Sequence, residues 1–157
     1  MIYYDTREKP CAVKPILKTW DKLGIQYERR KLNVGDYMDS SNPHLVIERK
    51  GSFMEILANL SGDSARFDRE FKRGLSLGVS IKLLIENDSG IKKLEDVYCW
   101  KNPNHANSKL FMDGRELMER IHRIKIKYGV DVFFCEKRET PYKILEILGE
   151  KEGEKHE

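Results

Sequence analysis

The stretch Gly35-Asp36-Tyr37, a short polar loop and then Leu45-Val46-Ile47-Glu48-Arg49-Lys50 is the most informative part of this chain. It indicates a glycine turn that carries an acid, followed by a buried strand that ends in Glu-x-Lys. Side chains alternate between the faces of a strand, so Glu48 and Lys50 point one way and Arg49 the other. Two carboxylates suit a hard divalent cation, and a lysine can steady an attacking water and developing charge. The pattern is therefore typical of metal-assisted phosphodiester cleavage.

Apolar periodicity on both sides of this stretch predicts an α/β chain. We expect strands over residues 2–5, 25–32, 45–48, 81–86 and 130–135, with 81–86 central because it is apolar nearly throughout. We expect helices over about 13–23, 53–60, 64–77, 114–128 and 141–148. Gly24 and Gly129 are the expected helix stops, and Asp113 and either Asp63 or Ser64 are the expected caps. Residues 99–108 read as an irregular loop. Strands that mostly alternate with helices favour a three-layer domain.

The composition describes a charged globular domain rather than a membrane or disulfide-rich chain. The 157 residues suit one domain, with 39% hydrophobic and 35% charged residues. No apolar run is long enough to span a membrane, the N-terminus is unlike a signal peptide, and the three cysteines lack metal-ligand spacing. We therefore expect an intracellular protein with no membrane contact, cytoplasmic and nucleoid-associated, or nuclear in a eukaryotic host. A net charge of +3 allows a polyanionic partner without demanding one.

Taken together in order, the motifs resemble the PD-(D/E)xK nuclease core, and more narrowly the XPF-type structure-specific endonuclease domain with its GDx(n)ERKxxxD signature. The resemblance also rests on Asp5-Thr6-Arg7-Glu8 after the first strand, on Arg66 in a basic helix, and on Leu83-Leu84-Ile85-Glu86. It covers residues 1–149, leaving 150–157 as a charged tail expected to be flexible.

This resemblance implies a fold and an activity. The fold would be a restriction-endonuclease-like core, a mixed sheet of about five or six strands flanked by helices. The activity would be hydrolysis of branched DNA (flaps, forks or nicked junctions) in repair, recombination or replication, with Mg²⁺ that Mn²⁺ can replace. The relatives act as dimers, so a homodimer or heterodimer through the C-terminal helices is implied. Tyr142, Leu145, Ile147 and Leu148 are candidates for that apolar seam, although core packing explains them equally well.

Two departures accompany the resemblance. The last Asp of the signature falls on Met54, and the nearest acid is Glu55, whose side chain on a helix is turned by about 100°. Relatives usually carry a helix-hairpin-helix pair or a helicase portion, which this sequence does not show, so a stand-alone version is expected. The alternative function is an inactive or catalytically weak DNA-binding scaffold, with Met54 as the first sign of decay.

The candidate site residues have the following roles and alternatives. Asp36 and Glu48 are the expected metal ligands and Lys50 the residue that positions water; alternatively they are a turn residue, a strand-end ion pair and a surface lysine. By the resemblance, Arg49 is catalytic, and Arg7, Arg49 and Arg66 grip flanking phosphates, although Arg49 can also pair away from Lys50. Tyr37 is expected to stack on a base or to wall the pocket.

Other acidic and aromatic positions are less specific. By the resemblance, Asp5 and Glu8 lie at the edge of the site as indirect ligands or ligands of a second metal; alternatively Asp5 or Thr6 caps the first helix. Asp113-Gly-Arg-Glu116 repeats the Asp-x-Arg-Glu pattern but fits a capping box, and Glu136-Lys137-Arg138 reads as surface. The loop around Trp100 is a further candidate for DNA contact.

Overall fold

A single mixed sheet of six strands organises the protein, in the order β2-β1-β3-β4-β5-β6. The computed structural model describes residues 1–62, 64–104 and 111–149. The strands are β1 (Ile2–Tyr4), β2 (Tyr27–Arg29), β3 (Tyr37–Asp39), β4 (Leu45–Lys50), β5 (Ser80–Glu86) and β6 (Asp131–Cys135). β3 is antiparallel to both β1 and β4, whereas β4, β5 and β6 run parallel. The predicted three-layer α/β fold with a mixed sheet is confirmed.

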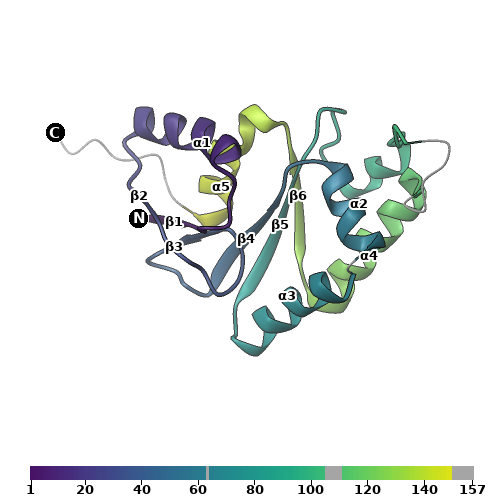
Figure 1. Ribbon diagram of the computed structural model, residues 1–157, viewed down its shortest axis with the longest axis horizontal. Helices are drawn as coiled ribbons and strands as arrows, with labels where there is room; N and C mark the ends of the chain where they lie inside the picture. The colour runs from purple at the N-terminus through teal and green to yellow at the C-terminus, as the bar shows by residue number, and fades with distance from the viewer. Residues whose placement is uncertain (63, 105–110, 150–157) are drawn as a thin grey trace.

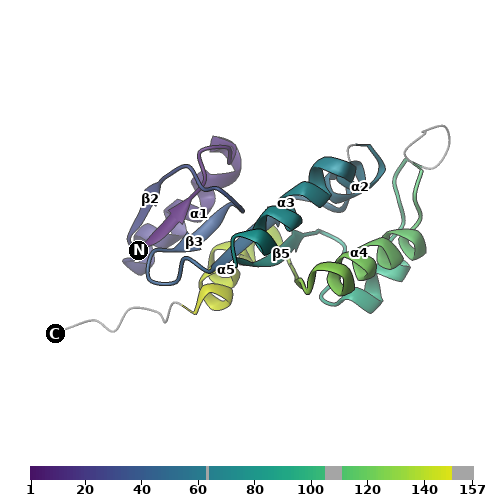
Figure 2. The same cartoon turned by 90° about the horizontal axis from the view of Figure 1, so that it is seen from below.

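Helices cover both faces of this sheet (Figure 1). One face carries α1 (Pro10–Leu23) and α5 (Thr140–Leu148), and the other carries α2 (Phe53–Ser61), α3 (Ser64–Ser76) and α4 (Gly114–Tyr128). Two short 3₁₀ helices, η1 (Leu94–Cys99) and η2 (Lys137–Glu139), connect these elements. Figure 2 shows α1 with β1, β2 and β3 towards one end of the molecule and α2 and α4 towards the other, with α3 between them.

Alternation along the strands divides the core into two clusters. Ile47 and Leu84 face the α1/α5 side and pack with Trp20, whose indole N–H donates to the Pro141 carbonyl at 3.0 Å. Val46, Ile81, Leu83, Ile85 and Phe134 face the other side, where they meet α2, α3 and α4. Because β5 is buried on both faces, its apolar sequence is explained by its position between two parallel neighbours, as predicted.

The structure differs from the sequence prediction in three elements. β3 is a strand where only a turn and loop were expected; it is three residues long, too short for a clear alternating pattern. β2 is confined to Tyr27–Arg29, because the backbone N–H of Leu32 leaves the sheet edge to bind Asp5. η1 lies just before the loop predicted at 99–108, of which residues 105–108 are outside the described ranges.

Most of the predicted dimer seam on α5 belongs to the core. Leu145 and Leu148 are buried against α1 and the sheet, and Ile147 packs against the same cluster, whereas Tyr142 is half exposed. The core-packing alternative is therefore correct for these leucines. The predicted tail at 150–157 lies outside the described residues. Among the described residues, no helix is both long and apolar enough to cross a membrane.

Candidate active site

The hairpin of β3 and β4 brings Asp36 beside Glu48. Asp36 directly precedes β3, and its backbone N–H donates to the Ile47 carbonyl on β4 at 2.7 Å. Gly35 makes this approach possible: its φ is +75°, and a Cβ there would lie 2.9 Å from the side chain of Val46. A residue with a side chain would thus be strained and would clash, so the glycine of the predicted turn is a steric requirement.

Asp36 and Glu48 are two carboxylates in a poorly solvated place. Oδ2 of Asp36 accepts the backbone N–H of Arg49 at 2.8 Å. Burial raises the pKa of Asp36 well above its ordinary range, and the charges of Glu48 and Glu8 raise it further. Burial also raises the pKa of Glu48, although Lys50 opposes this shift. Burial and the repulsion between the two carboxylates oppose their simultaneous ionisation. A cation bound between them would reduce that repulsion.

Lys50 is held inside the site rather than on a solvated face. Its ammonium lies 3.1 Å from Oε1 of Glu48 and 5.1 Å from the centre of the Phe67 ring on α3. The side chain is 9% exposed. The surface-lysine alternative is therefore wrong, because a salt bridge and a cation–π contact fix this ammonium next to the carboxylate pair.

Arg49 points away from Lys50 into an ion-pair cluster. Its guanidinium donates from Nε and Nη2 to the two oxygens of Glu8 at 2.7 and 2.9 Å, and from Nη1 to Glu86 at 3.1 Å. The hydroxyl of Thr140 also donates to Glu86, at 2.8 Å. This geometry matches the pairing alternative: the buried guanidinium pairs with both Glu8 and Glu86, and the Arg49 backbone N–H donates to Asp36.

These groups line one cleft of about 580 Å³. Its lining includes Glu8, Asp36, Glu48, Arg49, Lys50, Glu55, Arg66, Phe67, Glu70, Glu86 and Lys137, together with Arg7, Lys9 and Asn59. Arg66 is exposed at the cleft, and the side chain of Arg7 is half exposed while it binds Asp5. Both arginines therefore lie where a phosphate backbone entering the cleft would pass.

Asp5 has neither of its predicted roles. It is fully buried, does not line the cleft, and accepts hydrogen bonds from the backbones of Leu32 (2.7 Å) and Arg7 (3.1 Å) and from the Arg7 side chain. Burial would raise the pKa of Asp5, but these hydrogen bonds outweigh burial and lower it. It does not cap the first helix, nor does Thr6, because α1 begins at Pro10 after Lys9. Asp5 instead fixes the loop that presents Arg7.

The predicted role of Tyr37 is wrong. The side chain is 0% exposed and meets Trp20 edge-on, with ring centres 6.0 Å apart, on the α1/α5 side of the sheet. Tyr37 follows Asp36 directly, and alternation along β3 turns it into the core when Asp36 faces the cleft. It cannot stack on a DNA base, and it is not part of the cleft lining.

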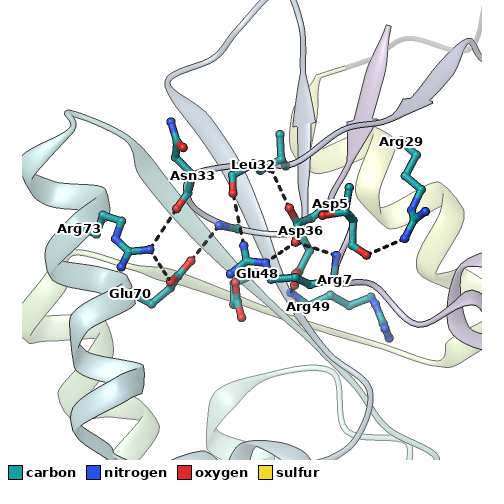
Figure 3. A network of polar contacts seen from close by, with 12 residues as sticks. Asp5, Arg7, Arg29, Leu32, Asn33, Asp36, Glu48, Arg49, Glu70 and Arg73 are labelled. Carbon is teal, nitrogen blue, oxygen red and sulfur yellow. Dashed lines mark hydrogen bonds and ion pairs between the residues drawn. The ribbon is translucent and has the colours of Figure 1, made fainter.

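Three supports of the site were missed by the sequence analysis, and all three come from α3. Oε1 of Glu70 accepts the backbone N–H of Gly35 at 3.1 Å, and Arg73 donates to the Asn33 carbonyl at 3.4 Å (Figure 3). Phe67, one turn earlier, lies under Lys50. Phe67 and Glu70 are three residues apart and share a helix face, which is the signal available in the sequence.

The remaining positions named in the sequence analysis are the two acidic patterns on other helices and the end of the signature. Asp113 caps α4 by accepting the Glu116 N–H at 2.8 Å, and Glu136 caps η2, so both patterns are structural. Met54 lies outside this cleft. Glu55 lines it, but one of its oxygens accepts the Gly51 N–H at 2.7 Å, closing the turn after Lys50.

The donor set fits one divalent cation with oxygen ligands. Within the described ranges, no three Asp, Glu, His or Cys side chains gather at metal-ligand spacing, so the chain offers the Asp36–Glu48 pair. The raised pKa values of both acids are the observation that favours a cation there. Mg²⁺ and Mn²⁺ accept such ligands and complete their coordination with water.

We expect the stabilising effect of Mg²⁺ to depend on pH through Asp36. An acid with a raised folded-state pKa lowers the stability of the metal-free protein as pH rises from its ordinary pKa of 3.8 to the raised value. Added Mg²⁺ should reverse this loss, so the shift in Tm on adding Mg²⁺ should grow as pH rises. In Asp36→Asn, which keeps the acceptor for Arg49, both effects should be smaller, and what remains should come from Glu48, whose pKa is also raised. Thermal melts across pH, with and without Mg²⁺, measure this; equal Mg²⁺ shifts in both proteins would contradict it.

Comparison with known proteins gives one family and one fold. The ERCC4 domain matches residues 4–148. The structure of XPF from Aeropyrum pernix superposes with a TM-score of 0.64 at 20% identity, and XPF from Aeropyrum pernix in complex with DNA with 0.65 at 19%. Each superposition covers 94% of this chain and 62% of the other, so this chain spans less than two thirds of those relatives. Among curated proteins, no match was found.

Proposed function

The chain belongs to the ERCC4 domain family, and on this premise we propose that it is a divalent-metal-dependent endonuclease that hydrolyses phosphodiester bonds in branched DNA. The observation that carries the proposal is the trio of Asp36, Glu48 and Lys50 in one cleft, with both carboxyl pKa values raised and the lysine immobilised. DNA as the substrate is supported by the relative solved in complex with DNA and by Arg7 and Arg66 at the cleft.

In the proposed mechanism, Asp36 and Glu48 hold the cation, which when bound supplies Lewis acidity for water activation. Lys50, kept beside Glu48 by the Phe67 ring, orients the attacking water and stabilises the negative charge that develops on the phosphate. Water attacks phosphorus and the bond to the 3′ oxygen breaks, so the products carry a 5′-phosphate and a 3′-hydroxyl. The Glu8–Arg49–Glu86 cluster fixes the Arg49 side chain, and the backbone N–H of Arg49 donates to Asp36 and orients its carboxylate.

A second function, DNA binding without cleavage, is favoured by a specific observation. Met54 replaces the last acid of the signature, and Glu55 is engaged by the Gly51 backbone rather than turned towards the Asp36–Glu48 pair. The intact trio argues against this function, because a site that has lost its activity would not need a buried lysine held beside Glu48. A measurement of DNA strand cleavage distinguishes the nuclease from the DNA-binding scaffold.

The test is a panel of labelled 3′-flap, fork, nicked and linear duplex DNA, incubated with Mg²⁺ and then with Mn²⁺. We expect cleavage near the boundary between single and double strand, little cleavage of linear duplex, and none in Glu48→Ala or in chelator. Binding without cleavage in either metal would favour the scaffold. Cleavage that persists in Glu48→Ala would remove the assignment of the active site.

The proposal also includes pairing with a second nuclease-domain chain. Since Leu145 and Leu148 are buried, α5 contributes little beyond Tyr142 to such an interface. Sedimentation of the purified chain, alone and with branched DNA, measures its oligomeric state.

A further inference from the structure

A second hollow of about 720 Å³ adjoins the active-site cleft. It is lined by Gly51, Ser52, Phe53, Met54, Glu86, Asn87, Asp88, Trp100, Pro103, Glu136, Lys137 and Arg138. Three of these, Gly51, Glu86 and Lys137, also line the cleft that contains Lys50. The two spaces therefore meet at a lip where Gly51 contributes no side chain.

The hollow has apolar and aromatic walls. Phe53 and Trp100, which are 3% and 9% exposed, pack with ring centres 5.4 Å apart at the inner wall, and the partly buried Met54 and the exposed Pro103 complete this side. Met54 occupies the position where the family signature has its last acid, so the departure from the signature changes the wall of this hollow rather than the metal pair. Aromatic rings and flexible thioethers suit the flat, neutral face of a nucleobase.

The charges around the hollow favour a base over a phosphate inside it. Glu86 shares the Arg49 guanidinium with Glu8, which leaves this cluster with a net negative charge, and Glu136 lies 2.7 Å from Arg138. Asp88 is exposed at the wall, where a carboxylate would repel phosphate but accept hydrogen bonds from the N–H groups of a base, such as the imide N–H of thymine. Lys137 borders both spaces, so its ammonium lies where the phosphate that joins two nucleotides would pass.

We propose that this hollow binds one unpaired nucleobase of the strand whose neighbouring phosphate lies at Lys50. The inference rests on the proposed function, because the strand is the DNA substrate. A base paired in a duplex cannot enter, so the hollow selects DNA with an unpaired nucleotide next to the scissile bond. It thereby supplies a physical basis for preferring branched over linear DNA.

Trp100 provides a direct readout that does not depend on catalysis. The chain has two tryptophans, and Trp20 is fully buried in the core cluster on the other face of the sheet. Titration with a short single-stranded oligothymidylate in chelator should quench Trp100 fluorescence saturably. The quench should be absent in Trp100→Phe, and an oligonucleotide of the same length with abasic sites should not produce it.

Met54 tests the nature of the wall. Met54→Asp should weaken the oligothymidylate affinity about tenfold, the scale of one lost base–side-chain stack, whereas Met54→Leu should bind like the original chain. Melting temperatures of both variants show whether they fold. Equal quenching by the abasic oligonucleotide, or equal affinities of Met54→Asp and Met54→Leu, would overturn the inference.

The outcomes also separate this inference from the proposed function. If the original chain cleaves flaps but oligothymidylate leaves Trp100 fluorescence unchanged, the hollow is not a base site and the nuclease proposal stands. If Trp100 is quenched as expected but the original chain cleaves none of the branched substrates, the base site stands and the nuclease proposal fails.

Discussion

Lys50→Met is expected to lower the rate of DNA cleavage by about 10²–10³-fold, the range for removing one preorganised group that stabilises developing charge. Methionine keeps the length of the side chain over Phe67 and removes the ammonium beside Glu48. Because Asp36 and Glu48 remain, the stabilisation by Mg²⁺ should persist. Single-turnover cleavage of a flap substrate measures the rate, and melts with Mg²⁺ measure the metal site.

Lys92→Met is the matched control for this prediction, because Lys92 is exposed and lines neither hollow. It should cleave at the original rate. A Lys50→Met rate within about threefold of that control would show that Lys50 has no catalytic role. Loss of the Mg²⁺ effect in Lys50→Met would instead mean that the lysine supports the ligands.

Gly114→Ala is expected to cause the largest loss of stability. Gly114 starts α4, and a Cβ there would lie 2.5, 2.6 and 2.7 Å from the backbone carbonyl oxygens of Val97, Trp100 and Tyr98. Backbone oxygens cannot rotate away as a side chain can, so α4 or η1 must shift. We expect a loss of about 3 kcal/mol, at the upper end for overpacking, or roughly 6–12 °C in Tm.

Gly129→Ala, at the other end of α4, is the matched control. A Cβ there meets nothing within 4 Å, and the cost comes from a φ of +63°, which amounts to about 1 kcal/mol. Thermal unfolding followed by circular dichroism compares the two. If Gly114→Ala melts no lower than Gly129→Ala, the close packing of η1 on α4 does not limit stability.

The sequence predicted correctly those features of the fold and of the candidate site that depend on a local pattern of residues along the chain. Alternation placed Glu48 and Lys50 on one face of β4, and the signature with its glycine turn placed Asp36 beside them. The apolar run of β5 identified a strand that is buried on both faces between two parallel neighbours, although it lies next to the edge strand β6 rather than at the centre of the sheet. Such features depend on neighbours in the chain and on the period of a strand, which can be read directly.

Contacts between distant segments were not predictable in the same way. Arg49 forms ion pairs with Glu8 and Glu86, which lie 41 and 37 residues away in the sequence. Glu70 accepts the backbone N–H of Gly35, which is 35 residues away. These pairings depend on the strand order and on the position of α3, which no local period encodes. Tyr37 was misjudged because β3 went unrecognised, and without a strand there was no alternation to turn it inward.

The turn of the β3–β4 hairpin lies at the far end from the Asp36–Glu48 pair. Residues 40–44 form this turn, in which the Asn42 N–H donates to the Asp39 carbonyl at 3.0 Å. Asp36 lies at the other end of the hairpin, just beyond the paired residues Tyr37 and Ile47. Insertions or deletions between Ser41 and Pro43 would therefore lengthen or shorten the hairpin tip without changing the register that joins Asp36 to Glu48. The variable gap in GDx(n)ERK therefore corresponds to the hairpin tip, where the number of residues can change while the spacing between Asp36 and Glu48 stays the same.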